Sequence, residues 1–191
     1  MKTKLSIIVL LAGVIFCAGC SGQDKSNPTT ETVVISESEA KIITGAIVEA
    51  DFIFTDKGLS FPLMSKLDDL IVHFGDDYQV NAAVSCAFVG EDKEILYDGL
   101  SIYTNPIDGG DTIGEILVSG TSYLTPRGIG VGATRDEVEA AYGPGFDEQG
   151  VLVYISSGIE GDLEAPRLSF FFDSQGKVES ISYFIALYTQ F

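Results

Sequence analysis

The stretch GIGVGATRDEVEAAYGPG, Gly128–Gly145, predicts one of the two short helices around which this chain is organised. Val138 and Tyr142 stand four positions apart, the spacing that places two side chains on one face of a helix. Before them, Thr134 and Glu137 have the S/T-x-x-E spacing of a capping box, which satisfies the free amides of a helix start. Gly and Pro follow directly after Tyr142, so the helix is expected to end there.

The glycines in front of this helix look like a phosphate-binding loop. Gly128, Gly130 and Gly132 alternate with Ile129 and Val131, which instead predicts a short strand with inward-pointing apolar side chains. A dinucleotide-binding turn needs G-x-G-x-x-G within a parallel βαβ unit, and a P-loop needs a lysine that this stretch lacks. We therefore predict that the chain binds no nucleotide, and we predict no other cofactor.

A second helix is predicted in SKLDDLIVHFG, residues 65–75. Its apolar residues share one helix face: Leu67, Leu70, Ile71 and Phe74. When the sequence is shifted on itself by 68 residues, the two helices align without a gap, and Gly75 meets Gly143. The chain is therefore predicted to contain two tandem repeats, at about residues 52–119 and 120–187.

Short runs of Val, Ile, Phe and Tyr between Gly, Asp and Pro predict strands in both repeats. The predicted strands are residues 79–89, 94–104 and 112–119 in the first repeat and 151–156, 167–172 and 178–187 in the second. One helix per repeat can cover only one face of a sheet. The predicted fold class is α+β, with two tandem helix-plus-antiparallel-sheet repeats forming one sheet that has its helices on one face. The pattern does not place residues 33–51.

The N-terminal residues have the composition of an export signal. Lys2 and Lys4 precede the apolar segment 5–16, which is shorter than the about 20 residues that a membrane-spanning helix needs. The following CAGC, which ends at Cys20, resembles the lipobox of bacterial lipoproteins, with a cysteine where leucine is usual. We predict a lipoprotein signal peptide at 1–19, a lipidated Cys20 with a flexible tether at 20–32, and a globular domain at 33–191.

Acidic residues far outnumber basic ones. The chain has 11 Lys plus Arg and 28 Asp plus Glu, a formal net charge of −17. Loss of Lys2 and Lys4 with the signal peptide leaves nine basic and 28 acidic residues, or −19. This charge repels nucleic acid and anionic lipid headgroups. We therefore predict no nucleic-acid partner, and attachment to the extracytoplasmic face of the cell membrane through the N-terminal lipid.

Two motifs carry a resemblance to a known family. SCAFVGEDK at 85–93 and TPRGIGVGATRDEVEAAYG at 125–143 resemble a family of uncharacterised lipoproteins from Gram-positive anaerobes, over about residues 51–184. The resemblance implies a tandem helix-plus-sheet architecture similar to that of the beta-lactamase inhibitor protein. It implies no catalytic residue.

Few residues offer nucleophilic or zinc chemistry. Cys86 is the thiol that remains after signal cleavage and lipidation, and its apolar neighbours predict a buried, unreactive side chain. His73 is the only histidine, so the usual zinc ligands cannot be assembled, and we predict a structural role for it.

The acidic turn at residues 105–115 allows two interpretations, a calcium site or a solvated hairpin turn. NPIDGGDTIGE, residues 105–115, places Asp108, Asp111 and Glu115 in and after a Gly-rich turn, and calcium binds such oxygens. The spacing does not fit an EF-hand, and the alternative is a hairpin turn with solvated carboxylates.

Aromatic residues on the uncovered sheet face are the remaining candidates for function. Alternation places Tyr103 and Phe171 opposite the apolar face of their strands, and Tyr97 and Tyr183 lie on or beside predicted strands. The leading hypothesis is a non-catalytic protein-binding or inhibitor-like module that recognises an envelope protein or wall component. The alternative is a calcium-dependent or carboxylate-based envelope hydrolase.

Overall fold

The computed structural model describes residues 47–187, which all lie in one compact unit, Ser38–Phe191. The predicted signal peptide, Cys20 and the tether lie outside the described residues. Within the described part, no helix is long and apolar enough to cross a membrane.

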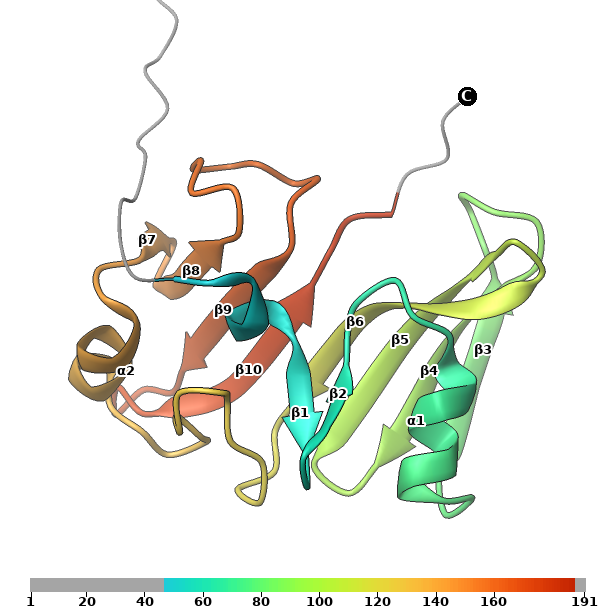
Figure 1. The fold of residues 1–191 in the computed structure, drawn as a ribbon, viewed down its shortest axis with the longest axis horizontal. Helices are drawn as coiled ribbons and strands as arrows, with labels where there is room; N and C mark the ends of the chain where they lie inside the picture. The colour runs from blue at the N-terminus through green and yellow to red at the C-terminus, as the bar shows by residue number, and fades with distance from the viewer. Residues whose placement is uncertain (1–46, 188–191) are drawn as a thin grey trace, which may run out of the picture. The chain divides into compact units, whose positions relative to one another are not determined.

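The fold is α+β, with two helices and one large antiparallel sheet (Figure 1). The helices are α1 (Leu67–Phe74) and α2 (Arg135–Tyr142). The large sheet comprises β3 (Gln79–Val84), β4 (Glu91–Tyr97), β5 (Leu100–Ile107), β6 (Gly110–Val118), β7 (Phe146–Glu148), β8 (Val151–Ile155), β9 (Arg167–Phe172) and β10 (Val178–Phe184). Their order is β3-β4-β5-β6-β10-β9-β8-β7, so β6 and β10 join the two halves.

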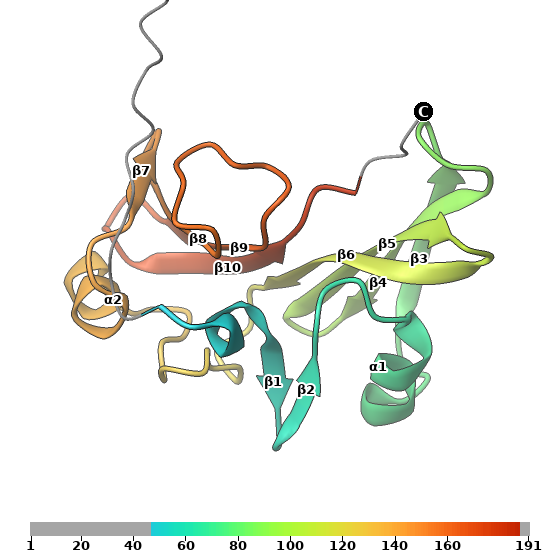
Figure 2. The same ribbon diagram turned by 45° about the horizontal axis from the view of Figure 1, so that its top comes forward.

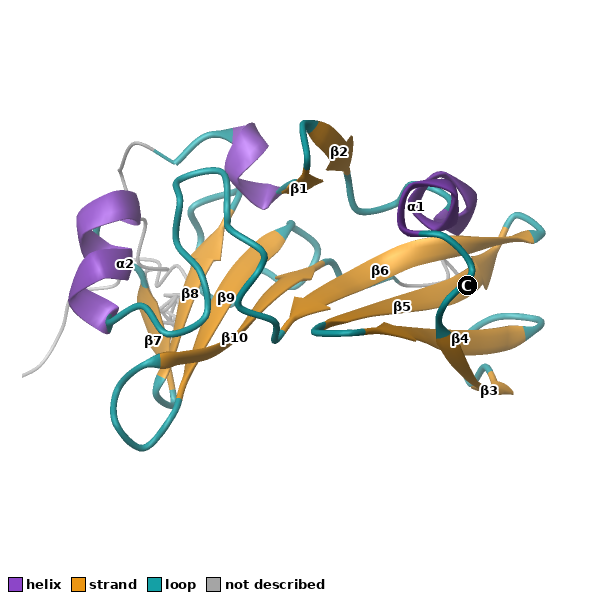
Figure 3. Cartoon of the chain, turned by 90° about the horizontal axis from the view of Figure 1, so that it is seen from below, coloured by secondary structure: helices purple, strands orange, loops and turns teal. Residues whose placement is uncertain are grey.

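A small second sheet precedes α1. It pairs β1 (Phe54–Asp56) with β2 (Leu59–Phe61) and follows a short 3-10 helix, η1 (Glu49–Phe52). Figures 2 and 3 show this hairpin, η1 and α1 on the same side of the large sheet. The Phe54 side chain is buried, and its ring centroid lies 5.9 Å from that of Tyr183 on β10. The hairpin therefore covers the sheet near the point where its halves join.

Several predicted strand limits were wrong. The single strand expected at 94–104 is two strands, β4 and β5, because a turn at Asp98–Gly99 reverses the chain. Gly99 has a φ of 69°, and a Cβ there would lie 2.4 Å from Gly120 Cα. Strand β7 was not predicted, because three residues are too few for an alternating pattern.

The predicted start and end of α2 are confirmed. The Thr134 hydroxyl accepts a hydrogen bond from the Glu137 amide, and the Glu137 carboxylate accepts one from the Thr134 amide at 2.7 Å. Gly143 ends the helix with a φ of 78° and a ψ of −174°, and its N–H donates to the Glu139 carbonyl. Only glycine adopts that backbone region without strain.

The strand predicted at 128–132 was wrong. Gly128 and Gly132 have φ values of 79° and 93°, which an extended strand does not allow. The segment is a turn, in which the Ile129 amide donates to the Thr125 hydroxyl and the Ile129 side chain is buried. The glycines thus permit a change of chain direction.

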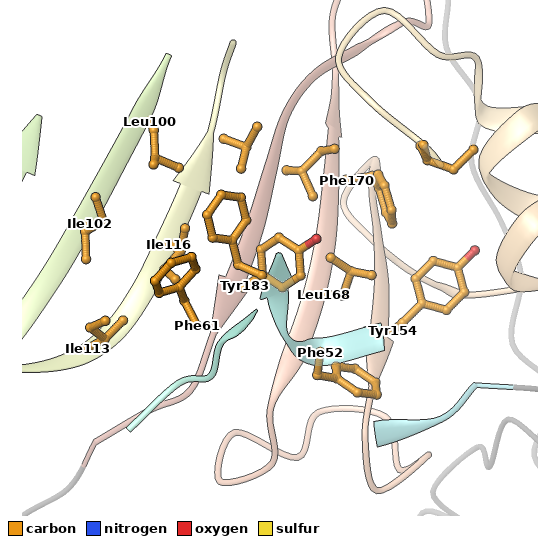
Figure 4. Close-up of a cluster of buried hydrophobic side chains, with 14 of the residues drawn as sticks. Phe52, Phe61, Leu100, Ile102, Ile113, Ile116, Tyr154, Leu168, Phe170 and Tyr183 are labelled. Atoms are coloured by element: carbon orange, nitrogen blue, oxygen red, sulfur yellow. The ribbon is translucent and has the colours of Figure 1, made fainter. Parts of the chain in front are cut away.

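The main core lies on one face of the large sheet, and a smaller buried cluster of Phe146, Val153 and Ile155 lies on the other face at the β7–β8 end. Facing residues of six strands form a buried row across both halves: Ile95, Ile102, Ile116, Tyr183, Leu168 and Tyr154. Figure 4 shows several of these side chains together with Phe52 and Phe61, which reach them from η1 and β2. Each such buried apolar side chain contributes about 1.5–3 kcal/mol to folding.

Candidate functional site

The face of the large sheet opposite this core is here called the open face. Strand register places five side chains in one row across it, the cross-sheet row: Glu94, Tyr103, Glu115, Phe184 and Arg167. They come from β4, β5, β6, β10 and β9, so the row runs across the junction of the two halves. Alternation along each strand aims them away from the core.

Tyr103 is held in this row by Glu94. The Tyr103 phenol donates to Glu94 Oε1 at 2.8 Å, and Asn81 Nδ2 donates to Glu94 Oε2 at 2.9 Å. Partial burial, followed by the hydrogen bond to Glu94, raises the pKa of Tyr103 to about 12. The hydrogen bonds from Asn81 and then Tyr103 lower the pKa of Glu94. The pair therefore presents a charged carboxylate and a neutral phenol at ordinary pH.

The other end of the row borders a hollow of about 310 Å³ between β6 and β8. Arg167 forms an ion pair with Glu148 of β7, and its Nε has no hydrogen-bond partner among the described residues. The Ser182 hydroxyl donates to Glu115 Oε1 at 2.6 Å. Phe171, which is 37% exposed, and Phe184 supply apolar surface beside these polar groups. Such a mixture of apolar and charged groups is typical of a binding surface.

Tyr103 borders a different hollow of about 340 Å³, which lies beside β3. Tyr103 on β5 and Phe171 on β9 are about 14 Å apart across the sheet, and Phe171 is also displaced by four residues along β9 from the cross-sheet row. The structure therefore places the two predicted anchors on the same face, as expected, but it does not bring them into one pocket.

The other two aromatic candidates lie on the core side of the sheet. Tyr183 is buried, and its pKa is raised chiefly by that burial. Tyr97 packs between Phe74 and Tyr78, with ring centroids at 5.4 and 5.5 Å, and its hydroxyl donates to the Gly75 carbonyl. The predicted partner-binding role of Tyr183 was wrong, because its ring is buried against Phe54 of β1. Tyr97 is only partly buried, so its binding role stays a prediction.

The three acids proposed for calcium do not converge. Asp108 is exposed in the β5–β6 turn with a φ of 52°, Asp111 forms a 2.8 Å ion pair with Lys93, and Glu115 accepts from Ser182 on the open face. No group of three potential metal ligands occurs within residues 47–187. Asp111 and Glu115 lie four residues apart on the extended strand β6 and bind different partners, so their carboxylates do not meet as those of a tight calcium loop do.

Cys86 differs from its prediction. Its side chain is exposed in the β3–β4 loop and lines a hollow of about 1120 Å³, together with Met64, Val89 and Leu187. The prediction of a buried side chain was wrong, because the apolar residues around Cys86 lie in a loop that reverses the chain and not in the core.

His73 has the structural setting that was predicted. Its Nε2 lies 2.8 Å from Asp56 Oδ2, and its ring packs 4.6 Å from that of Phe74 and 5.2 Å from that of Phe61. This contact links α1 to the β1–β2 hairpin on the core side of the sheet.

The positions of Glu94, Arg167 and Asn81 on the open face were not predicted from the sequence. Each lies in a strand among other polar residues, and only the pairing of strands far apart in sequence brings them beside Tyr103 or Phe171. No spacing in the sequence carries this information.

Comparison with known proteins adds little to this site. No protein-family model matches the chain, and no curated protein matches it. Among solved structures, the chain is similar to the uncharacterized protein yfeY from Escherichia coli, at 15% sequence identity. The TM-score is 0.37, and the match covers 64% of this chain and 92% of that one. A similarity of this size says nothing about what the chain binds.

Proposed function

We propose that this protein is a lipid-anchored, non-catalytic binding module, similar in type to a protein inhibitor, which acts at the extracytoplasmic face of the cell membrane. The charged start, apolar segment and lipobox-like CAGC ending at Cys20 support export and lipidation. The net charge of −17 favours anchoring by a lipid over adsorption to an anionic membrane surface.

The open face is the observation that carries the binding role. This face carries the exposed Phe171 ring. On the same face, hydrogen bonds orient the Tyr103 phenol towards Glu94 and the Ser182 hydroxyl towards Glu115. Aromatic rims beside ordered polar groups are frequent anchors of protein interfaces, since burial of the ring and hydrogen bonds then act together. The partner is an envelope protein or wall component.

We also propose that the two halves of the sheet are tandem repeats of the type implied by the lipoprotein family resemblance. Each helix precedes four antiparallel strands and ends in a glycine of almost the same conformation, Gly75 (83°, −172°) and Gly143 (78°, −174°). Each glycine carbonyl accepts a tyrosine hydroxyl from the second following strand, Tyr97 at 2.9 Å and Tyr154 at 2.8 Å. These matched contacts support a duplication that includes the helix end.

The binding role is tested by capture from native envelope with the full-length protein as bait. Phe171→Ala should reduce recovery of the captured partner at least about tenfold, because truncation of a central aromatic anchor costs about 2 kcal/mol or more. Val72→Ala is the matched control, since Val72 is 86% exposed on α1, which lies on the other side of the sheet. Equal recovery with Phe171→Ala and wild type would refute the open-face role.

The anchor is tested separately. Cys20→Ala should abolish incorporation of labelled fatty acid and release the protein from the membrane fraction. Continued labelling of the variant would show that lipidation occurs elsewhere.

A further inference from the structure

Strand β3 is an edge of the large sheet with few of the usual protections. All six residues of QVNAAV are exposed, and within residues 47–187 β3 pairs only with β4. It carries no charge and no proline, and its register with β4 is continuous over six residue pairs. Edge strands are commonly protected by charged side chains, by proline, by a bulge in the register or by being short. The opposite edge, β7, has three residues and two of them are acidic.

In the part of the chain that the structure describes, the backbone of β3 has N–H and C=O groups at this edge without a bonding partner. The Ser85 amide donates to the Gly90 carbonyl at 3.0 Å, and hydrogen-bonded pairs alternate along an antiparallel ladder. The N–H and C=O groups of Val80, Ala82 and Val84 therefore point away from β4. An additional strand could bond to all three residues without any change in the existing sheet.

The hollow beside β3 is acidic. Asn81 and Ala83 border it from β3, and the carboxylates of Asp92 and Glu94 border it from β4. Neutral groups hold these carboxylates: Asn105 Nδ2 donates to Asp92 at 2.7 Å, and Asn81 and Tyr103 donate to Glu94. Within residues 47–187, neither carboxylate forms an ion pair: Lys93 also lines the hollow, but its ammonium group pairs with Asp111. The hollow thus offers two oriented negative charges and the Tyr103 ring.

We propose that β3 accepts an extended, basic segment of the partner protein as a ninth strand of the large sheet. An added strand lies about 4.8 Å from β3 and twice that from β4. A Lys or Arg side chain opposite Ala83 passes over its methyl group and places its charge between Asp92 and Glu94, near the face of Tyr103. Main-chain bonds to Val80, Ala82 and Val84 supply affinity, and the hollow selects the basic side chain.

Charge decides between this occupant and a second copy of the chain. Two copies joined through β3 would bring together two molecules with a net charge of −17 each, which repel. A basic segment is instead attracted to the acidic surface. The inference rests on the proposed binding role, but it uses a surface remote from Phe171.

The test uses the full-length protein in detergent and fluorescent peptides of about eight residues that alternate Thr with Lys, Gln or Glu. The Lys peptide should bind most tightly and the Glu peptide least. Ala82→Pro removes one outward amide and should weaken binding of the Lys peptide at least about tenfold, since proline is tolerated where the amide points out of the sheet. Ala82→Thr keeps that amide and should bind as wild type.

A combined Asp92→Asn and Glu94→Gln variant should lose the preference for the Lys peptide over the Gln peptide. Hydrogen exchange on the wild-type protein provides a measurement that needs no variant. The Lys peptide should protect the amides of Val80, Ala82 and Val84, while those of Asn81 and Ala83 already bond to β4. Full binding by Ala82→Pro, or protection elsewhere than β3, would overturn the proposal.

Two further outcomes separate this proposal from the open-face role. Self-association of the wild type that Ala82→Pro abolishes would make a second copy the occupant and would overturn the proposal. Phe171→Ala should leave peptide binding unchanged. Loss of envelope capture in Phe171→Ala with no peptide binding by the wild type would refute the β3 proposal alone.

Discussion

Arg127 holds Asp51 with two hydrogen bonds, Nε to Oδ1 at 2.8 Å and Nη2 to Oδ2 at 2.6 Å. The Asp51 side chain is 3% exposed, and the guanidinium also donates to the Ala141 carbonyl and lies 4.9 Å from the Tyr142 ring centroid. Arg127 therefore joins η1 to the end of α2, although Arg127 and Asp51 are 76 residues apart in the sequence.

We expect Arg127→Met to lower the free energy of unfolding by about 3–5 kcal/mol, because it leaves a buried carboxylate without its partner. Arg135→Met is a matched control, since Arg135 also lies over an aromatic ring, that of Phe172 at 4.8 Å. Its ion pairs with Glu139 and Asp147 are exposed, so the loss should be about 1 kcal/mol or less. Denaturant unfolding of both variants measures the difference. Equal losses would contradict a special role for Asp51.

We expect Gly143→Ala to destabilise the fold by about 1–3 kcal/mol, because its φ of 78° with ψ of −174° is a region that suits only glycine. A Cβ at this position would contact nothing within 4 Å, so the cost is backbone strain and not a clash. Gly75→Ala should behave alike, since its conformation is nearly the same. Thermal unfolding measures both. A neutral effect at either glycine would show that the helix end relaxes.

We expect Tyr154→Phe to cost about 0.5–1.5 kcal/mol, because the Gly143 carbonyl loses the 2.8 Å hydrogen bond of a buried hydroxyl. Tyr97→Phe removes the corresponding bond to Gly75 in a more exposed place and should cost less. Urea unfolding of the two variants compares them. A larger loss for Tyr97→Phe would argue against this account of burial.

We expect Glu94 to make stability depend on pH on the acidic side. Hydrogen bonds from Asn81 and Tyr103 hold its pKa below the ordinary 4.5. A carboxyl whose folded pKa is lowered stabilises the fold above its unfolded pKa, and that stability is lost as the pH falls through the folded value. Glu94→Gln should therefore flatten the decline of the melting temperature below about pH 4.5. An unchanged decline would remove Glu94 from the groups responsible, and Glu91→Gln on the same strand is the control.

We expect the Tyr103 phenol to ionise near pH 12, because burial and the neighbouring Glu94 carboxylate disfavour the phenolate. Stability from this group is present below the unfolded value of 10 and is lost as the pH rises towards 12. The ultraviolet difference between wild type and Tyr103→Phe isolates this titration from those of the other tyrosines. A midpoint near 10 would mean that the phenol does not donate to Glu94.

Local chemistry in the sequence was sufficient for several elements. Thr134, Glu137 and Gly143 act within a few residues of one another, so the spacing alone predicts where α2 begins and ends. Periodicity likewise predicted the apolar faces of both helices, where Leu70 and Val138 are buried. The strand predicted from the alternating glycines at 128–132 was wrong, because a hydrophobic pattern does not reveal the positive φ angles of Gly128 and Gly132.

The sequence predicted which face of a strand a side chain lies on better than it predicted which residues that side chain contacts. Alternation correctly separated Tyr103 and Phe171 from the apolar face of their strands. Alternation could not show that Phe54 packs on the Tyr183 ring or that Tyr97 packs on α1, since those contacts join distant parts of the chain. Asp111 and Glu115 were predicted as ligands of one calcium site, but Asp111 pairs with Lys93 and Glu115 accepts a hydrogen bond from Ser182.

The sequence by itself determined the fold class, the acidic charge and the two helices, because these depend on composition and on contacts between near neighbours. An export signal at the N-terminus stays a prediction from composition. Only the tertiary structure decided which side chains share the open face, that β3 is an unprotected edge, and that Glu94 stands between Asn81 and Tyr103. Strand order and register set these relationships, and they arise when apolar rows from both halves are buried against one core.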